Sequence, residues 1–168
     1  RSLAFEDGLT RLPNRRECYR HIDAALGHDS SEAVHRLAVV FMDLDSFKHI
    51  NDSMGHAFGD RLLTRVAAAL RASLPEGANA YRLGGDEFVV LLRELSADTA
   101  ISVARKVLDE VRAISDIDGV ELNISASLGV ALYPEHGSER KDLLQYADAA
   151  MYEAKLAGRN LVRVFDPD

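Results

Sequence analysis

The segment Gly84-Gly85-Asp86-Glu87-Phe88 joins two glycines to two carboxylates, directly ahead of the apolar run 89–92. Paired glycines are ordinary at a hairpin turn. Turn chemistry, however, does not require two acidic residues next. A charged pair that enters a buried strand must be solvated, paired or bound to a ligand. These residue types therefore favour a metal and phosphate site at the turn.

A second pair of carboxylates, Asp43 and Asp45, follows the apolar run 37–42. If that strand lies beside the glycine hairpin, Asp43 and Asp86 approach each other, and two close carboxylates repel unless a cation lies between them. Oxygen ligands without sulfur or imidazole favour Mg²⁺ or Mn²⁺, which keep waters and substrate phosphates as further ligands. The alternative is that Asp43 and Asp45 simply terminate a strand.

The segment 47–60 gathers an amide, carboxylates, a lysine and two glycines in a short span. Asn51 and an aspartate such as Asp60 suit a guanine edge, because a carboxylate accepts from N–H groups while an amide offers both donor and acceptor. Lys48 is suited to neutralising phosphate. The alternative is a capped loop without a ligand.

Two cations, Lys155 and Arg159, lie four residues apart near the end of the last predicted helix. Cations at a helix C-terminus complement the helix dipole, which is a purely structural role. They are also suited to reach the phosphate tail of a nucleotide. Both interpretations are compatible with the spacing.

The hydrophobic pattern predicts the elements that must position these residues. Apolar residues at helical spacing predict four helices, over 13–26, 62–74, 100–114 and 144–154. Shorter apolar runs predict five strands, over 37–42, 80–83, 88–92, 122–132 and 161–165. The run 122–132 alternates with small or polar residues, which indicates a strand with two unlike faces. With a hairpin in the middle, this order predicts an α/β domain with a mixed sheet rather than a strictly parallel one.

Composition narrows the class of protein. The chain has 168 residues, is 47% hydrophobic and carries a net charge of -7, which fits one globular domain and argues against a nucleic-acid partner. We identify neither a membrane span nor a secretory signal, so we expect no membrane contact by this domain. The lone Cys18 excludes an internal disulfide and is consistent with a reducing, cytoplasmic compartment. The abrupt start at Arg1 suggests a piece of a longer multidomain protein.

Taken together, these motifs resemble the GGDEF domain of the diguanylate cyclase family over nearly the whole chain. The segments that match are 7–16, 43–48, 51–52, 55–56, 59–60, the signature 84–88, 127–130 and 154–160. The resemblance implies a five-stranded mixed sheet flanked by helices, related to nucleotide cyclases and to the palm of polymerases. It also implies that residues 1–168 form a single domain of this kind.

The resemblance implies that two GTP condense into cyclic di-GMP, a bacterial second messenger, with release of two pyrophosphates. Each 3′-hydroxyl attacks the α-phosphorus of the other nucleotide. Asp43, the Leu44 carbonyl and Asp86 match positions that hold Mg²⁺ or Mn²⁺, which would lower the pKa of the hydroxyl and offset charge on the phosphate. Asp86 also matches the usual proton acceptor, and Glu87 or a metal-bound water are alternatives.

Further positions match residues that contact the nucleotide in this family. They are Phe47, Lys48, Asn51, His56, Asp60, Gly84, Gly85, Lys155 and Arg159. Among these, Asn51 and Asp60 match contacts to guanine, and Lys48, Lys155 and Arg159 match contacts to phosphate.

The implied enzyme is a homodimer, because one domain binds one GTP and each copy supplies half a site. Adjacent sensor or phosphodiesterase domains would raise the local concentration of the two halves. The ending 164–168 looks like the join to a phosphodiesterase domain in tandem proteins. One alternative function is therefore a non-catalytic GTP-binding regulator of such a domain. Another is an interaction module that docks a partner through its acidic surface.

One departure from the family pattern concerns product inhibition. Many members carry an R-x-x-D site for the product, with its aspartate six residues before the first signature glycine. Pro75 and Ala78 occupy these positions here. The sequence therefore predicts no product inhibition through that site.

Overall fold

Five strands form one mixed sheet in a computed structural model that describes residues 4–27 and 33–168. The strand order is β2-β3-β1-β6-β7. The bounds are β1 (Leu37–Leu44), β2 (Asn79–Gly84), β3 (Glu87–Arg93), β6 (Ala126–Tyr133) and β7 (Leu161–Val164). All neighbouring pairs are antiparallel except β6 and β7, which are parallel. The predicted five-stranded mixed sheet, with the strand before Asp43 at its centre and 161–165 at an edge, is confirmed.

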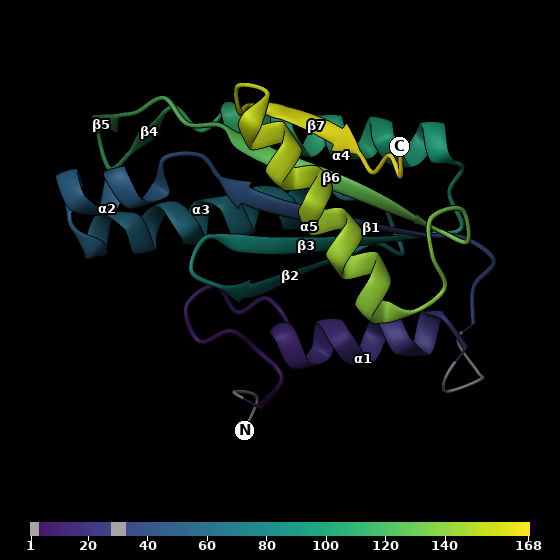
Figure 1. Ribbon diagram of the computed structural model, residues 1–168. Coiled ribbons are helices and arrows are strands. Elements are labelled where there is room, and N and C mark those ends of the chain that lie inside the picture. Colours follow the sequence, from purple (N-terminus) through teal and green to yellow (C-terminus); the bar gives the residue numbers. More distant parts are fainter. Residues whose placement is uncertain (1–3, 28–32) are drawn as a thin grey trace.

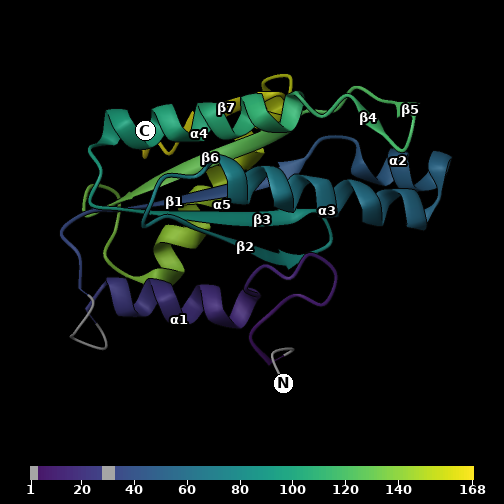
Figure 2. The same cartoon turned by 180° about the vertical axis from the view of Figure 1, so that it is seen from behind.

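The described residues form five helices around this sheet. They are α1 (Arg15–Ala25), α2 (Phe47–Met54), α3 (His56–Ser73), α4 (Ala97–Arg112) and α5 (Arg140–Leu156). Helices α1 and α5 lie over one face (Figure 1), and α3 and α4 lie over the other (Figure 2). None of the helices in the described ranges is long and apolar enough to cross a membrane.

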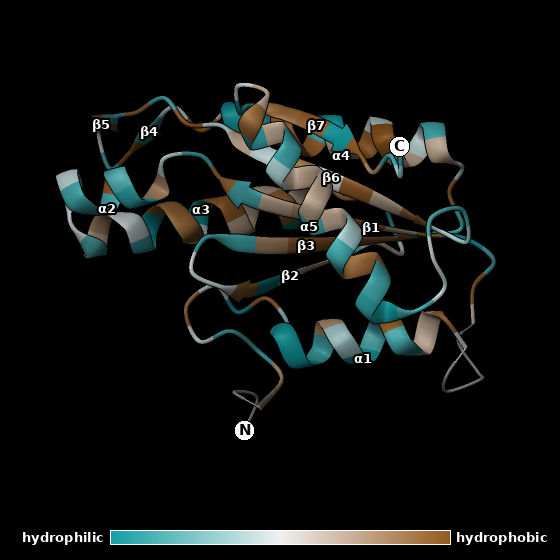
Figure 3. Ribbon diagram, in the orientation of Figure 1, coloured by the Kyte–Doolittle hydropathy of each residue, from teal (hydrophilic) through white to brown (hydrophobic). Residues whose placement is uncertain are grey.

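The core consists of two apolar layers, one on each side of the sheet. All eight residues of β1 are buried, so alternate side chains feed both layers. This double burial explains why the strand reads as a continuous apolar run. Figure 3 shows hydrophilic residues where β1 ends and β3 begins, although both strands are otherwise largely apolar. The polar ends of these two strands meet at the same end of the sheet.

The prediction of a single strand over 122–132 was partly wrong. Strand β6 begins only at Ala126, and a short hairpin of β4 (Asp116–Ile117) and β5 (Val120–Glu121) precedes it. Its turn is Asp118-Gly119, with φ of 52° and 84°, which is the Asp-Gly turn chemistry of a tight hairpin. The Asp-Gly pair is thus a sequence signal for this hairpin.

The alternation of apolar with small or polar residues indicated a strand with two unlike faces. Strand β6 does not have them, because seven of its eight residues are buried. Its small residues reflect close packing of α5 instead. A Cβ added at Gly129 would lie 2.1 Å from the carbonyl oxygen of Ala147. Only glycine allows α5 to approach the sheet this closely.

The connection between β1 and α3 is helical, although the hydrophobic pattern predicted no helix between residues 42 and 62. Helix α2 ends at Met54, and Gly55, with φ of 94°, separates α2 from α3. The opening helix begins later than expected, since Asn14 is its N-cap and accepts a hydrogen bond from the Glu17 amide at 3.1 Å. Pro13 thus precedes the helix instead of lying in its first turn.

Candidate metal and nucleotide site

The glycine turn joins β2 to β3 and carries its carboxylates to the end of β1. Gly84 has φ of 142° and Gly85 φ of 51°, and a Cβ on either would meet no atom within 4 Å. The backbone here is therefore open to a ligand. In the β1–β3 register Asp43 lies opposite Glu87. The predicted approach of the hairpin carboxylates to Asp43 is confirmed.

Asp43 is a buried carboxylate with one satisfied oxygen. The residue is 8% exposed, and its Oδ2 forms an ion pair with Nζ of Lys155 from α5. Its Oδ1 is buried and has no hydrogen-bond partner within the described residues. A buried anionic oxygen without a donor is costly. This atom is therefore suited to binding a cation.

Burial, and after it mutual repulsion, raises the pKa values of the acids next to Asp43. Burial, together with the Asp43 carboxylate, raises the pKa of Asp86 to about 7. Burial, with Asp43 and Asp148 nearby, also raises the pKa of Glu87. Burial and Asp43 likewise raise the pKa of Asp148, which lies on α5. A divalent cation placed among these carboxylates would relieve this repulsion.

The oxygen donors at this end of the sheet fit part of the coordination shell of Mg²⁺ or Mn²⁺. Residues 4–27 and 33–168 contain no group of three or more His, Cys, Asp or Glu side chains that forms a ready cage for a metal. Asp43 and Asp86 offer carboxylate oxygens, and the expected third donor is the backbone carbonyl of Leu44. Mg²⁺ is typically bound by one or two carboxylates and completes its shell with water and phosphate. The hard oxygen donors and the orphaned Oδ1 therefore fit such an ion.

The expected base-binding residues lie at the junction of α2 and α3. Asn51 Oδ1 is buried without a hydrogen-bond partner among the described residues. A Cβ on Gly59 would lie 1.9 Å from this oxygen and 3.3 Å from Cζ of Phe47. The missing side chain at Gly59 thus makes the space that the Asn51 amide occupies. His56 and Asp60 are exposed on the first turns of α3.

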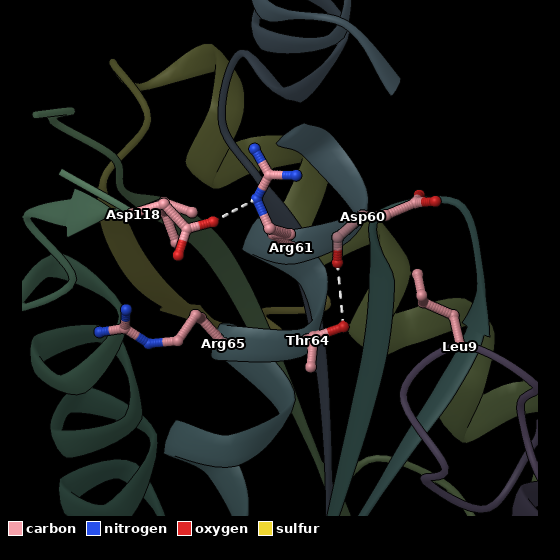
Figure 4. A pocket seen from close by; sticks show the side chains of 7 residues that line it. Leu9, Asp60, Arg61, Thr64, Arg65 and Asp118 are labelled. Atoms are coloured by element: carbon pink, nitrogen blue, oxygen red, sulfur yellow. Dashed lines mark hydrogen bonds and ion pairs between the residues drawn. The ribbon is translucent and has the colours of Figure 1, made fainter. Parts of the chain in front are cut away.

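Asp60 borders a cavity of about 300 Å³ between α3, the N-terminal turn and the β4–β5 hairpin. Its lining residues are Leu9, Asp60, Arg61, Thr64, Arg65, Ile117 and Asp118. In Figure 4 the Asp60 carboxylate extends toward Leu9, whereas Arg61 points the other way and pairs with Asp118 at 2.6 Å. None of the residues drawn in Figure 4 forms a hydrogen bond or ion pair with the Asp60 carboxylate.

The expected phosphate-binding cations do not all gather at the carboxylates. Lys155 reaches Asp43 directly. Lys48 instead pairs with Asp52 at 3.0 Å on the exposed side of α2. Arg159 is exposed in the loop after α5. The structure thus brings together Asp43, Asp86, Glu87 and Lys155 from the set of candidate residues.

Two charged residues beside the carboxylates were missed at the level of sequence. Asp148 lies seven residues before Lys155, and this two-turn spacing puts both on one face of α5. Arg15 of α1 donates to the Leu83 carbonyl at 3.4 Å. Together with Glu87 and Asp148 it lines a cavity of about 340 Å³. The helical spacing could have identified Asp148, whereas Arg15 lies in the family-matching segment 7–16 but had no role assigned to it there.

Hydrogen bonds from Arg82 connect the glycine turn to the N-terminal turn. Arg82 donates to the Gly85 carbonyl at 2.8 Å and to the Asp7 carboxylate at 2.9 Å. Asp7 also accepts from the Thr10 amide at 2.8 Å. The N-terminal turn 7–10 is thereby tied to the hairpin that carries Asp86.

These features define an α/β domain with a five-stranded mixed sheet and an acidic glycine hairpin at the end of its central strand. Residues 4–161 match the family model described as diguanylate cyclase, GGDEF domain. The chain belongs to this family.

Similar proteins include enzymes of both cyclic di-GMP synthesis and breakdown. The chain is 41% identical over 168 residues to the cyclic di-GMP phosphodiesterase PdeR of Escherichia coli, covering 100% of this chain and 25% of PdeR. It is 44% identical over 158 residues to the bifunctional diguanylate cyclase/cyclic di-GMP phosphodiesterase MucR of Pseudomonas aeruginosa, covering 94% of this chain and 23% of MucR. The chain thus spans about a quarter of the length of these curated relatives.

Solved structures of GGDEF domains share the fold. The GGDEF domain of TpbB (YfiN) from Pseudomonas aeruginosa superposes with a TM-score of 0.88 at 42% identity, covering 96% of this chain and 94% of that domain. The similarity therefore extends through the sheet and the helices that surround it.

Proposed function

We propose that this domain is a diguanylate cyclase that condenses two GTP into cyclic di-GMP and two pyrophosphates at the interface of a two-fold homodimer. The observation that carries this proposal is the orphaned Oδ1 of the buried Asp43, beside Asp86 on the glycine hairpin. A structural strand end gives no reason to bury an unpaired anionic oxygen. A site for a cation and a triphosphate does.

Asp43, Asp86 and the Leu44 carbonyl would hold Mg²⁺ or Mn²⁺. When bound, this ion supplies positive charge that neutralises the phosphates and stabilises the charge that develops on them. Lys155 adds a cation at the same place, since it already contacts Asp43. Arg159 and Lys48 would approach the phosphate tail from the loop after α5 and from α2.

A carboxylate of the glycine hairpin would accept the proton of the 3′-hydroxyl. As the oxygen–phosphorus bond forms, the hydroxyl proton passes to a carboxylate, and the bond to pyrophosphate breaks. Asp86 matches the family's usual acceptor. Burial and the Asp43 carboxylate raise the pKa of Asp86 to about 7 without the metal, and a carboxylate that holds the metal is a weaker base than this value implies. Glu87, whose pKa is also raised, is the alternative acceptor.

Asn51 and Asp60 would bind the guanine edge, with Phe47 and His56 beside the nucleotide. The exposed Asp60 carboxylate can accept from the ring and exocyclic N–H groups of guanine, which adenine presents differently. Gly84 and Gly85 would let the hairpin backbone approach the ligand, because no Cβ blocks either position. This set of contacts predicts selectivity for GTP.

Each chain would supply half of the active site, so two domains must meet face to face. Adjacent sensor or phosphodiesterase domains would promote this meeting. Because GTP is a cytoplasmic metabolite, we place the domain in the cytoplasm. We propose no nucleic-acid partner, given the net charge of -7, and no membrane contact by the domain itself.

The test incubates the domain, fused to a parallel coiled coil that forces dimerisation, with GTP and Mg²⁺. Chromatography should detect cyclic di-GMP from the wild type and none from Asp86→Ala. A wild-type dimer that binds GTP without forming product would overturn the cyclase proposal.

That outcome would favour a second function, a GTP-binding regulator of an adjacent phosphodiesterase domain. The similarity to PdeR, a protein named as a phosphodiesterase, is the observation that supports it. Against it, Asp43, Asn51, Asp60 and Asp86 are all retained at their matched positions. A binding-only domain would have no need of an activated proton acceptor.

A further inference from the structure

Asp45 stands two residues after Asp43 but has entirely different surroundings. The residue is 7% exposed. Its Oδ1 accepts from the Ser127 hydroxyl at 2.7 Å, and its Oδ2 accepts from the Ser125 hydroxyl at 2.6 Å. Oδ2 also accepts from the backbone amide of Asn160 at 3.0 Å. Both carboxylate oxygens are therefore occupied, so Asp45 is not a free ligand as Asp43 is.

The third of these bonds reaches the loop between α5 and β7. Gly158, Arg159 and Asn160 have φ of 119°, 66° and 57°, so two consecutive residues other than glycine adopt a left-handed backbone. This conformation costs free energy and persists only where the surroundings impose it. The Arg159 amide bonds to the Ala154 carbonyl at 2.9 Å, and the Asn160 amide bonds to Asp45.

Apolar packing does little to hold this loop. Arg159 and Asn160 are exposed. On one side the loop borders a polar cavity of about 380 Å³, to which Asn160 and Ser125 both contribute. The hydrogen bond to Asp45 ties the last residue of the loop to the end of β1, next to Leu161, where β7 begins to pair with β6.

Asp45 is also fixed to the strand end that carries the carboxylates. Its backbone amide donates to the Ser125 carbonyl at 3.0 Å, which continues the pairing of β1 with β6. One side chain therefore connects the end of β1, the start of β6 and the loop bearing Arg159. Together with the hydrogen bond from the Arg159 amide to the Ala154 carbonyl, this connection fixes the backbone on both sides of Arg159.

We propose that Asp45 is a positioning residue that holds the loop after α5 in its left-handed conformation and thereby aims Arg159 at the phosphate tail of the substrate. This inference rests on the proposed function, in which Arg159 contacts the triphosphate. It assigns different roles to the two aspartates of the D-x-D segment. Asp43 faces the ligand, and Asp45 sets the geometry of a phosphate-binding cation.

The test compares Asp45→Asn with wild type in the binding of GTP and of GMP, measured by calorimetry with Mg²⁺. Asparagine has nearly the same shape, but its amide nitrogen replaces one acceptor by a donor. The Kd for GTP should rise about tenfold, as expected for one charge-assisted phosphate contact. The Kd for GMP, which lacks the β- and γ-phosphates, should not change.

A double-mutant cycle with Arg159→Ala identifies the route of the effect. In an Asp45→Asn background, Arg159→Ala should cause little further loss of GTP affinity. Full additivity of the two losses, an equal loss of GTP and GMP, or wild-type GTP affinity in Asp45→Asn would each overturn the inference.

Ser125→Ala keeps the test valid if Asp45→Asn fails to fold, because it deletes one donor and leaves the carboxylate in place. It should weaken GTP binding about threefold and leave GMP binding unchanged, and unchanged GTP affinity would count against the inference. A wild type that binds no GTP would instead overturn the proposed function, and this inference with it. The two failures are thus distinguishable.

Discussion

Lys155 of α5 forms an ion pair with Oδ2 of the buried Asp43, while Oδ1 of the same carboxylate has no partner in the described structure. The ammonium group therefore neutralises part of the charge that a bound cation would otherwise neutralise. Asp86, Glu87 and Asp148 surround this pair and have raised pKa values. The site without its ligands thus carries excess negative charge, balanced at Asp43 by one lysine.

Lys155→Met should destabilise the metal-free domain, because it leaves the Asp43 carboxylate buried without a cation. Breaking a fully buried pair costs about 3–5 kcal/mol, and the partial exposure of Lys155 reduces the expected loss to about 2 kcal/mol. Urea denaturation in EDTA measures it. Mg²⁺ should restore more stability to Lys155→Met than to wild type.

The matched control is Lys141→Met, at an exposed position of the same helix, which should change the free energy of unfolding little. Equal stability of the two variants in EDTA would show that the ion pair at Asp43 contributes nothing.

The metal-free domain should lose stability as pH rises from about 4 to about 7. The pKa of Asp86 is raised from 3.8 to about 7 in the folded state. Between these values the folded state binds more protons than the unfolded state, so the free energy of unfolding falls with increasing pH. Melting temperatures in EDTA from pH 5 to 8 should show this decline.

Asp86→Asn removes the titrating group and should flatten the decline, with a melting temperature at pH 8 on the order of 5 °C above wild type. Parallel pH profiles for the variant and wild type would contradict the assignment to Asp86.

Gly59→Ala should impair GTP binding without unfolding the domain. The new Cβ would lie 1.9 Å from Asn51 Oδ1, so the amide must move. Since Asn51 is expected to bind guanine, the Kd for GTP should rise at least about tenfold, the worth of one good polar contact. Calorimetry measures the affinity, and circular dichroism verifies the fold.

Asn51→Ala provides the reference for this prediction. If Gly59→Ala acts through Asn51, the double variant should bind GTP no more weakly than Asn51→Ala alone. Further weakening in the double variant would locate the effect elsewhere.

Product inhibition should be absent at the turn between α3 and β2. Pro75 and Ala78 line a cavity of about 360 Å³ there, and neither side chain carries a charge to bind cyclic di-GMP. Cyclase activity should therefore be unaffected by micromolar product. The double substitution Pro75→Arg and Ala78→Asp should introduce inhibition.

Activity measured at increasing cyclic di-GMP, in both proteins, decides this point. Tight product binding by the wild type that disappears when residues 75–78 are changed would refute the prediction.

The sequence allowed much of the central sheet to be predicted, and the reasons are local. Strand β1 is buried on both faces, so its apolar run left little alternative to a central strand. The paired glycines Gly84-Gly85 indicated a hairpin turn, which is also a local signal. By contrast, the β4–β5 hairpin was overlooked although Asp118-Gly119 signalled it, and the start of β6 was placed four residues early.

The candidate site was predictable only in part, because its remaining features depend on distant partners. In the sequence, Asp43 and Asp45 are two similar carboxylates at the end of one strand, and nothing distinguishes their roles. Their surroundings separate them. Lys155 contacts Asp43, whereas Ser125 and Ser127, about 80 residues further along the chain, donate hydrogen bonds to Asp45. The place of Arg15 beside the hairpin likewise follows from packing between α1 and the sheet.

The most direct test of the half-site account measures specific activity against protein concentration, for the free domain and for the coiled-coil dimer. The account predicts that cyclic di-GMP formed per protomer rises in proportion to the concentration of the dilute free domain, and is constant for the forced dimer. Activity per protomer that stays constant on dilution, while sedimentation shows a monomer, would mean that one chain holds a complete active site. That result, or the absence of cyclic di-GMP at every concentration of the forced dimer, would contradict the account.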